Sequence, residues 1–351
     1  MAEQPDFARR AAWLAPRLAT DVERVTEDGR PKSGFSAETV LVTAHTAAGP
    51  QRLVVRRETP DPAVYPAQTT ATDVEVDIQY RALAAVERAA DIPVAPLIGY
   101  EADPSVLGSP FFVMRYVAGQ VPIENPPYTR EGFFHDASPA ERGRMIAGGL
   151  DVLARVHRTD WRGAGLDWLV PDQGAADAAR QLRIWEAYAD RELDGRDHPV
   201  LERARTWLHA TPPRGGAPVL CWGDARPGNI IWDDFRPACV TDWEAVAIAP
   251  PETDLGWWLF FDRTMHEAID APRLPGEPTP PEQRDHYASA AKHDPGDVTP
   301  FEVFAGFRYA AIVVRTMNRL VARGVMPPDQ TVWLNNPPAT ALAQLLDEIG
   351  A

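Results

Sequence analysis

The stretch from Val219 to Gly256 constrains this chain more strongly than any other part of the sequence. It reads VLCWGDARPGNIIWDDFRPACVTDWEAVAIAPPETDLG, with short apolar runs on both sides of polar turns. Asp224 and Asn229 stand five positions apart with a Pro-Gly pair between them, and Asp242 follows after a second turn. Polar side chains set among apolar runs are costly to bury without a partner. We therefore expect the rest of the chain to be organised around this stretch.

The apolar runs inside this stretch predict a β-hairpin. Residues 230–232 and 238–241 read as two short strands around a polar turn. Pairing of these strands brings Asn229 and Asp242 together at one end of the hairpin. The sequence thus predicts a loop with one carboxylate, followed by an amide and a second carboxylate that lie close together.

This spacing fits the chemistry of phosphoryl transfer. That reaction needs an acceptor hydroxyl held in line, its proton accepted late, and the phosphate charge neutralised by Mg²⁺. Asp224 fits the role of proton acceptor, Asn229 fits a metal ligand, and Asp242 fits the stronger metal ligand. Each residue taken alone would fit a turn or a local cap better than a catalytic role. The three together favour the phosphoryl-transfer interpretation.

Length and composition restrict the class of protein. A chain of 351 residues suits two domains, or one domain of two lobes. Its 45% apolar and 24% charged residues are ordinary for a globular protein. The formal net charge of -15 disfavours nucleic acid, whose binding needs clustered Lys and Arg. The same charge is compatible with a cationic small-molecule substrate.

Other features of the sequence indicate a soluble, cytoplasmic protein. Two cysteines cannot form a disulfide scaffold, and they favour a reducing compartment. The first residues, MAEQPDFARR, lack the apolar run of a signal peptide. No apolar run is long enough to predict a membrane span. We therefore expect neither a membrane nor a nucleic-acid partner.

The pattern changes from strands to helices at a predicted hinge over residues 117–119. Before it, helices are predicted over 5–19 and 73–90, and strands over 38–45, 51–57, 97–101 and 110–116. After it, helices are predicted from 138 to 157 and over 178–193, 199–208, 255–269 and 340–349. Capping boxes are predicted at 138–141 and at 299–302, the second starting a helix that ends at 324. Residues 271–281 are rich in Pro and predict no regular structure.

The segments CWGDARPGNIIW and VTDWEAVAIAPPETDLG resemble the catalytic motif and metal-binding Asp of the aminoglycoside phosphotransferase and choline kinase-like family. Members usually read His-Gly-Asp-x-x-x-x-Asn, then Ile-Asp-Trp-Glu, then Pro-x-x-Asp-Leu. The resemblance extends over most of the chain. Its supporting segments are residues 36–39, 54–56, 106–111 and 153–157.

The resemblance implies an α+β, two-lobed protein-kinase-like fold. A small antiparallel-sheet lobe with one main helix would precede a larger, mostly helical lobe. Residues 1–117 would form the nucleotide-binding lobe, and residues 118–351 would carry the catalytic loop, the metal site and the substrate pocket. Family members use ATP or GTP with Mg²⁺ to phosphorylate hydroxyl groups of small molecules, so the chain is expected to be a small-molecule kinase.

The resemblance also assigns roles in the first lobe. Ser36 lies in the loop expected to approach the nucleotide. Arg56 matches the phosphate-binding lysine of the third strand, and Val54, on the same strand face, would cover the base. Arginine keeps the charge of lysine but changes the geometry of phosphate binding. The neighbouring Arg57 is an alternative candidate for this role.

The partner of that lysine is usually a Glu on the following helix. The matching position here is Gln79, and Glu75 lies one turn earlier on a similar face, so either could hold Arg56. The backbone of residues 114–117, which include Met114 and Tyr116, would form the hinge that meets the base.

The catalytic segment departs from the family pattern at one position. Trp222 stands where the family usually has a His that buttresses the loop. Asp254 matches a residue that supports this loop, and the N-cap of the following helix is an equally good interpretation. Arg226 and Glu244 lie inside the matched motifs and are expected to support the site.

Four other residues receive structural roles. His157 is expected to be a packed structural histidine, and Cys221 and Cys239 to be small core residues. Trp257 is expected in the core, although it could reach a pocket wall.

Two classes of function stay open from the sequence. The first is a kinase for a small hydroxyl compound, such as an aminoglycoside, an amino alcohol, a sugar, a macrolide or a hydroxyacyl thioester. The second is a nucleotide-binding pseudokinase with a regulatory role, which the substitutions at Trp222 and Gln79 would favour. Retention of Asp224, Asn229 and Asp242 argues for the first class.

Overall fold

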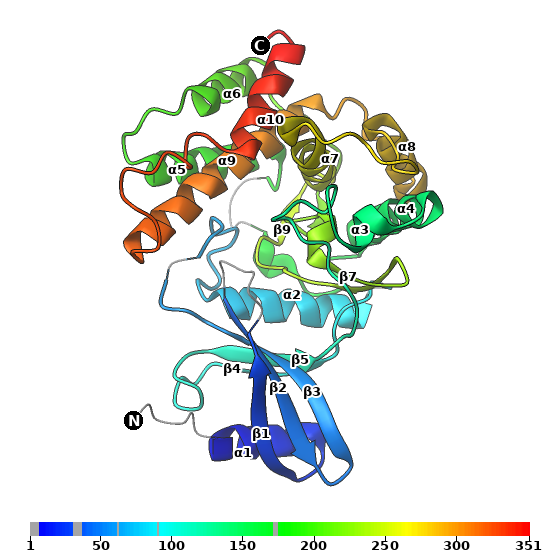
Figure 1. Cartoon of the computed structure of the whole chain (residues 1–351). Coiled ribbons are helices and arrows are strands. Elements are labelled where there is room, and N and C mark those ends of the chain that lie inside the picture. Colours follow the sequence, from blue (N-terminus) through cyan, green and yellow to red (C-terminus); the bar gives the residue numbers. More distant parts are fainter. Residues whose placement is uncertain (1–6, 31–36, 62, 90, 171–174) are drawn as a thin grey trace.

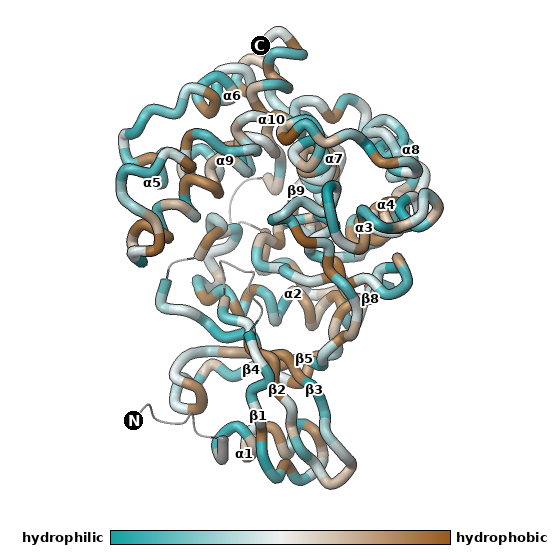
Figure 2. The backbone as a smooth tube through the Cα atoms, in the orientation of Figure 1, coloured by the Kyte–Doolittle hydropathy of each residue, from teal (hydrophilic) through white to brown (hydrophobic). Residues whose placement is uncertain are grey.

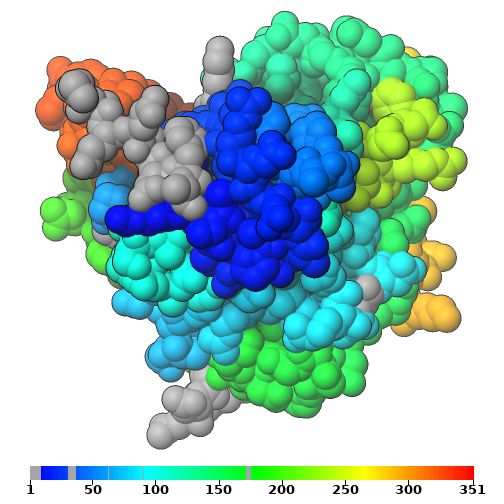
Figure 3. Space-filling view, turned by 90° about the horizontal axis from the view of Figure 1, so that it is seen from below, coloured from blue at the N-terminus to red at the C-terminus, as the bar shows by residue number. Residues whose placement is uncertain are grey.

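The computed structural model describes residues 7–30, 37–61, 63–89, 91–170 and 175–351. The described chain forms two lobes, a sheet-containing lobe and a larger helical lobe (Figure 1). The lobe boundary expected at residue 117 lies two residues after the last strand of the sheet. Viewed from the side of the first lobe, α1 and the neighbouring strands cover the middle of the molecule (Figure 3).

The first lobe contains a five-stranded antiparallel sheet in the order β1-β2-β3-β5-β4. Its strands are β1 (Val22–Gly29), β2 (Glu38–Thr46), β3 (Gly49–Arg57), β4 (Leu97–Glu101) and β5 (Phe111–Arg115). The polar strand β1 was not predicted. It lies at the sheet edge, and its burial pattern, in which Val25 is the buried residue, gives no period-two signal in the sequence.

Two helices pack on this sheet. Helix α1 (Phe7–Leu18) joins Leu53 and Val55 of β3 in one apolar cluster on the outer face. Side chains alternate along a strand, so Val54 and Arg56 lie on the opposite face, toward the helical lobe. Helix α2 (Glu75–Ala89) lies between the sheet and the helical lobe (Figure 2), and its buried residues belong to the second apolar cluster, which includes residues of that lobe.

The second lobe is mostly helical. Its helices are α3 (Phe133–Asp136), α4 (Pro139–His157), α5 (Ala178–Leu193), α6 (Pro199–Ala210), α7 (Glu252–His266), α8 (Pro280–Ala291), α9 (Thr299–Ala322) and α10 (Pro337–Glu348). Two short antiparallel pairs lie among them: β6 (Val219–Cys221) with β9 (Ala247–Ala249), and β7 (Ile230–Asp233) with β8 (Arg236–Val240). The capping box predicted at Ser138 and Glu141 is present at the start of α4.

Two predictions in this lobe, both away from the loop between β6 and β7, were wrong. Residues 280 and 281, in the passage expected to lack regular structure, begin α8, and a capping box formed by Thr279 and Glu282 starts that helix. The capping box predicted from Thr299 is not formed, because α9 begins at Thr299 itself and Val298 is its N-cap. In the described part of the chain, no helix is long and apolar enough to cross a membrane.

Candidate active site

The loop between β6 and β7 presents Asp224 at the centre of the molecule. Gly223 precedes it with a φ of 91°, and a Cβ atom there would lie 2.0 Å from the backbone oxygen of Ala245. Glycine is therefore required for the chain to turn so close to β9. The turn leaves Asp224 2% exposed, between the two short strand pairs.

Four side chains donate hydrogen bonds to the Asp224 carboxylate. Its Oδ1 accepts from Trp257 Nε1 at 2.9 Å and from Arg226 Nε at 3.0 Å. Its Oδ2 accepts from Asn229 Nδ2 at 2.7 Å and from the Tyr65 hydroxyl at 2.9 Å. A carboxylate has about four lone-pair sites, so these four donors occupy all the hydrogen-bond acceptor sites of Asp224.

Charge around Asp224 is balanced locally. Arg226 bridges Asp224 and Glu124 and lies over the ring of Phe261. Burial by itself lowers the pKa of Arg226, but the Asp224 and Glu124 charges outweigh it and raise this pKa well above its usual value. Arg226 thus stays a cation that fixes the Asp224 carboxylate.

The hairpin of β7 and β8 brings the second and third predicted residues to one end. Ile230 pairs with Val240, and Thr241 continues the contact by donating from its backbone N to Asn229 O at 2.9 Å. The Asn229 amide nitrogen also donates to Asp224 O, so its oxygen is the atom of this amide that could bind a cation. Asp242 follows with a φ of 53°, and its side chain is 34% exposed.

Arg56 joins the sheet to this hairpin. Its guanidinium donates to Thr39 Oγ1 at 2.7 Å and to Gln79 Oε1 at 3.3 Å. It also lies 3.3 Å from Asp242 Oδ1. The alternative candidate, Arg57, points elsewhere and pairs with Glu38 on the sheet. The structure therefore brings Arg56, and not Arg57, to the predicted metal ligand.

A carboxylate from the second lobe compensates for Gln79. Gln79 holds Arg56, whereas Glu75 binds the backbone N of Ala37 and the Gln79 amide. Glu244 Oε2 lies 3.7 Å from Arg56 and 3.3 Å from Gln79 Nε2. Of the two residues expected to hold Arg56, Gln79 does so, and Glu244 places a carboxylate near the same guanidinium.

Trp222 links the loop that carries Asp224 to the hairpin of β7 and β8. Its indole Nε1 donates to the backbone oxygens of Thr241 and Asp242, at 2.8 and 3.1 Å. Its side chain is fully buried and packs near Trp243. A larger aromatic ring therefore buttresses the loop at the position where the family usually has His.

Asp254 binds the backbone of the loop between β6 and β7. It accepts from the backbone N of Trp222 at 2.6 Å and of Gly223 at 2.9 Å. Asp254 lies inside α7, whose N-cap is Pro251, so the N-cap interpretation was wrong. His157 is buried and contacts Asp254 through Nε2 at 3.2 Å, which agrees with its predicted structural role.

Cys221 is close enough to His157 and Asp254 to raise the question of a metal site. The hydrogen bonds just described already engage the carboxylate and the imidazole. Burial raises the pKa of Cys221 well above its usual value and keeps the thiol protonated. This cluster therefore acts as packing beneath the loop, and Cys239 is likewise buried in the core.

The predicted base-binding residues lie along β3 and β5. Val54 pairs with Met114 in the sheet, and Val54 is buried. Tyr116 follows β5, and its backbone N donates to Arg52 O at 3.1 Å. Ser36 lies outside the described residues. The hinge then continues into the second lobe, where Gln120 exchanges backbone hydrogen bonds with Trp232.

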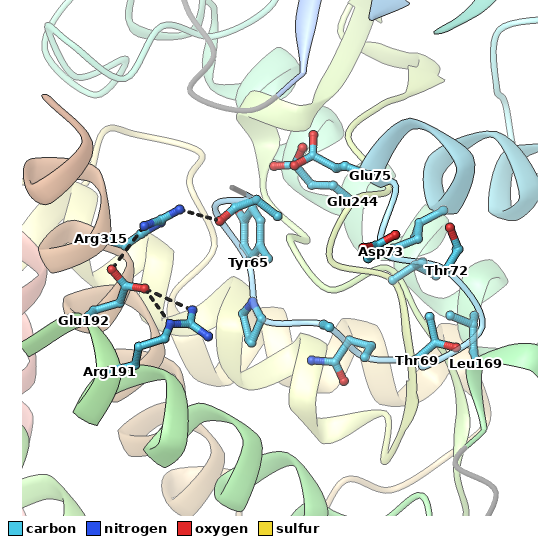
Figure 4. Close-up of a pocket in the computed structure, with 16 residues that line it drawn as sticks. Tyr65, Thr69, Thr72, Asp73, Glu75, Leu169, Arg191, Glu192, Glu244 and Arg315 are labelled. Carbon is cyan, nitrogen blue, oxygen red and sulfur yellow. Dashed lines mark hydrogen bonds and ion pairs between the residues drawn. The ribbon is translucent and has the colours of Figure 1, made fainter. Parts of the chain in front are cut away.

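Tyr65 lines a cavity of about 620 Å³ (Figure 4), and its hydroxyl is the group that binds Asp224. Residues 63–73, α2, α5, α9 and the segment after Asp242 supply its walls. Arg315 donates to Ala63 O and contacts Glu192 on one wall. Charged side chains on the lining are Asp73, Glu75, Glu192, Glu244, Arg191 and Arg315.

Sequence reasoning missed three of the contacts to this site. Trp257 was expected mainly in the core, yet its indole N–H binds Asp224. Tyr65 and Glu124 drew no attention, because they lie 159 positions from Asp224 and 102 positions from Arg226 respectively. The one available signal was at Trp257, an aromatic residue with a polar tip inside the helix predicted over 255–269.

Comparison with known proteins identifies a family and related folds for this chain. Residues 29–291 match the family described as "Phosphotransferase enzyme family". Among solved structures, a protein of Ralstonia eutropha named, provisionally, as an aminoglycoside phosphotransferase has a TM-score of 0.73, with 23% identity over 98% of both chains. A thermostable mutant of the aminoglycoside phosphotransferase APH(4)-Ia, in ternary complex with ADP and hygromycin B, has a TM-score of 0.57 and 13% identity, over 97% of this chain and 99% of that one.

Curated relatives are larger proteins. "Acyl-CoA dehydrogenase family member 11" of Gallus gallus is 28% identical over 221 residues, which cover 61% of this chain and 26% of that protein. The corresponding protein of Mus musculus is 28% identical over 247 residues, or 68% of this chain and 28% of that protein. The chain thus spans about a quarter of the length of these relatives.

The family match covers most of the chain and includes the catalytic loop, the hairpin and Asp254. The two-lobed protein-kinase-like fold implied by the resemblance is confirmed by the structural likeness over nearly the whole chain. The chain belongs to the phosphotransferase enzyme family.

Proposed function

We propose that this protein is a Mg²⁺-dependent kinase that transfers the γ-phosphate of ATP or GTP to a hydroxyl group of a small molecule. The observation that carries the proposal is the arrangement of Asp224, Asn229 and Asp242 at the meeting point of one loop and one hairpin. A carboxylate positioned beside two oxygen ligands is the combination that this chemistry needs. In this proposal Asp224 orients the acceptor hydroxyl and accepts its proton.

The residues present fit the nucleotide and the metal. The Asp242 carboxylate and the Asn229 amide oxygen would hold Mg²⁺, which prefers oxygen ligands. Arg56 would bind the phosphates, and the nearby Asp242 shows that its guanidinium reaches this region. When bound, Mg²⁺ neutralises phosphate charge. Val54, Met114 and the backbone near Tyr116 would hold the base.

The substitutions at Trp222 and Gln79 favoured a binding protein without transfer activity, but neighbouring contacts compensate for both. Trp222 keeps hydrogen bonds to the backbone at Asp242, so the loop and the hairpin stay joined. Glu244 stands near Arg56, where Gln79 lacks a charge. Both compensations support an active kinase over a pseudokinase.

The acceptor pocket in this proposal is the cavity beside Tyr65. Its described lining has more carboxylates than guanidinium groups, which supports an alcohol that carries a cationic group. Its volume of about 620 Å³ suits a ligand of moderate size. Aminoglycosides and amino alcohols are therefore the first acceptors to test, before sugars, macrolides and hydroxyacyl thioesters.

A two-stage assay tests the proposal. Thermal unfolding is first followed with Mg-ATP, Mg-GTP and each nucleotide with EDTA, because a ligand of the native state raises the melting temperature. ADP or GDP release is then measured across the acceptor panel, and the product is identified by mass spectrometry. A phosphorylated alcohol is the expected result. Nucleotide binding without a phosphorylated product from any class of acceptor would favour the pseudokinase.

A further inference from the structure

Tyr65 occupies the hydrogen-bond acceptor site on Asp224 that the hydroxyl of a substrate must use. Its phenol donates to Asp224 Oδ2 at 2.9 Å, which is the hydrogen bond expected of a substrate alcohol before transfer. Since the other donors fill the remaining lone-pair sites, an acceptor can bind Asp224 only if one donor leaves.

Three of the four donors are fixed by their surroundings. Trp257 lies in α7, and its ring contacts Arg308 and Tyr309 of α9. Asn229 also binds the backbone oxygen of Asp224, and Arg226 is held by Glu124. Tyr65, by contrast, lies in a segment without helix or strand between β3 and α2. It is the donor whose departure disturbs the least structure.

Burial raises the pKa of Tyr65 well above its usual value, and the charges of Asp224 and Glu244 raise it further. The phenol therefore stays protonated and acts as a hydrogen-bond donor. Its aromatic ring lies edge-on to Trp185 of α5, with 6.4 Å between the ring centroids. These contacts hold the hydroxyl on the carboxylate without a covalent or charged link.

The segment around Tyr65, residues 58–73 without residue 62, joins β3 to α2 and forms a strap that contacts the second lobe. Tyr188 donates to Val64 O at 2.5 Å, and Arg180 Nη2 donates to Gln68 O at 2.6 Å. Thr69 donates to Trp168 O at 2.6 Å. The strap therefore rests on α5 and the loop before it, and the cavity lies along the same segment (Figure 4).

We propose that Tyr65 is a specificity-determining residue that acts as an internal competitor of the acceptor. Its phenol occupies the acceptor position on Asp224, and a substrate hydroxyl from the adjacent cavity must displace it before phosphoryl transfer. The competitor also keeps water from Asp224, so it limits hydrolysis of the nucleotide when no acceptor is bound. This inference rests on the proposed kinase activity.

The substitution Tyr65→Phe tests the competitor, because it removes the hydroxyl and keeps the ring. With Mg-ATP alone, the variant is expected to hydrolyse ATP about ten-fold faster than the wild type, since water gains the vacated site on Asp224. With an acceptor from the panel, KM for the acceptor is expected to fall while kcat changes little. Tyr100→Phe, on β4, is the matched control and is expected to change neither value.

Tyr188→Phe provides a second variant that leaves Tyr65 and Asp224 intact. It removes the hydrogen bond from α5 to Val64 O, so the strap is less firmly held. A smaller rise in ATP hydrolysis is expected. Intact mass after incubation with Mg-ATP is measured for each variant, and no added phosphate is expected on the wild type.

Three results would overturn the inference. One is an unchanged or lower rate of ATP hydrolysis in Tyr65→Phe. Another is a rise that persists when Asp224→Asn is added to Tyr65→Phe. The third is a phosphate on the wild type that Tyr65→Phe lacks, which would make Tyr65 an acceptor itself. Failure of the proposed kinase function is distinguishable, because the wild type would then phosphorylate no acceptor of the panel, whereas failure of this inference alone leaves acceptor phosphorylation by the wild type intact.

Discussion

The indole nitrogen of Trp222 donates to the backbone oxygen of Asp242 at 3.1 Å, and so ties the catalytic loop to the proposed metal ligand. The same nitrogen reaches Thr241 O at 2.8 Å. One side chain thus sets the spacing between the proposed proton acceptor and the proposed metal ligand. The departure from the family's usual His is a different solution to the same structural need.

Replacing Trp222 by Phe should separate this link from simple packing. The change keeps a buried ring but leaves two backbone oxygens without their donor, at a cost of about 1–3 kcal/mol in the free energy of unfolding. We also expect a higher Mg²⁺ concentration for half-maximal activity, because Asp242 is less well placed. Both quantities are measured by denaturant unfolding and by a Mg²⁺ titration.

Trp258→Phe is the matched control for that experiment. Trp258 is equally buried and donates to Gln283 at 2.8 Å, away from the catalytic loop. It should lose a similar free energy of unfolding without a change in the Mg²⁺ requirement. An equal Mg²⁺ shift in both variants would contradict the role given to Trp222.

We propose that the charge of Glu244 replaces the charge that Gln79 lacks beside Arg56. Moving that charge from position 244 to position 79 tests this compensation. Glu244→Gln should weaken Mg-ATP binding by about five- to ten-fold, since Arg56 loses a nearby carboxylate and is less firmly placed. Adding Gln79→Glu to that variant should restore most of the affinity, because the charge returns on α2 beside the same guanidinium. Dissociation constants of the four proteins in the cycle are measured by calorimetry. Strictly additive effects would count against the compensation.

Stability is expected to depend on pH through Glu302 in α9. Burial raises the pKa of Glu302 from 4.5 to about 7, against the opposing charge of Arg263. Between these values the folded state holds a proton that the unfolded chain releases, so this contribution is present below pH 4.5 and is lost as the pH rises through 7. Glu302→Gln should therefore raise the free energy of unfolding at pH 8 by about 1–3 kcal/mol.

That gain should shrink toward zero as the pH falls to 5, because the wild-type carboxyl is then largely protonated in the folded state. Glu202→Gln, on the exposed side of α6, is the control and should show no such trend. The free energy of unfolding of the wild type and both variants is measured by denaturant unfolding at several pH values. A gain that is independent of pH would mean that the Glu302 charge is not responsible.

Local parts of the site could be predicted from the sequence, and long-range parts could not. The loop and hairpin were predictable, because Asp224, Asn229 and Asp242 are fixed by a turn and by one strand pair. Arg56 on its strand face followed from alternation. Tyr65 was not predictable, since its place on Asp224 depends on how α5 and the loop before it hold the strap.

The fold shows the same limit. Strongly periodic helices such as α5 were predicted at their observed bounds, Ala178–Leu193. The edge strand β1 was missed because it is mostly polar and partly exposed, and β2 alone pairs with it in the sheet. Helix α8 (Pro280–Ala291) was not predicted, because the prolines at its start were taken as a sign of irregular structure, although Pro is well suited to the first turn of a helix.

The most direct test of the account is the rate of phosphoryl transfer from Mg-ATP in Asp224→Asn, measured with the first acceptor that the panel identifies. We predict a loss of about 10²–10⁴-fold in kcat, because the acceptor hydroxyl loses its proton acceptor, while Mg-ATP still raises the melting temperature. Asp234→Asn, at the exposed turn between β7 and β8, should keep the wild-type rate. An Asp224→Asn protein that transfers phosphate at the wild-type rate would contradict the central claim.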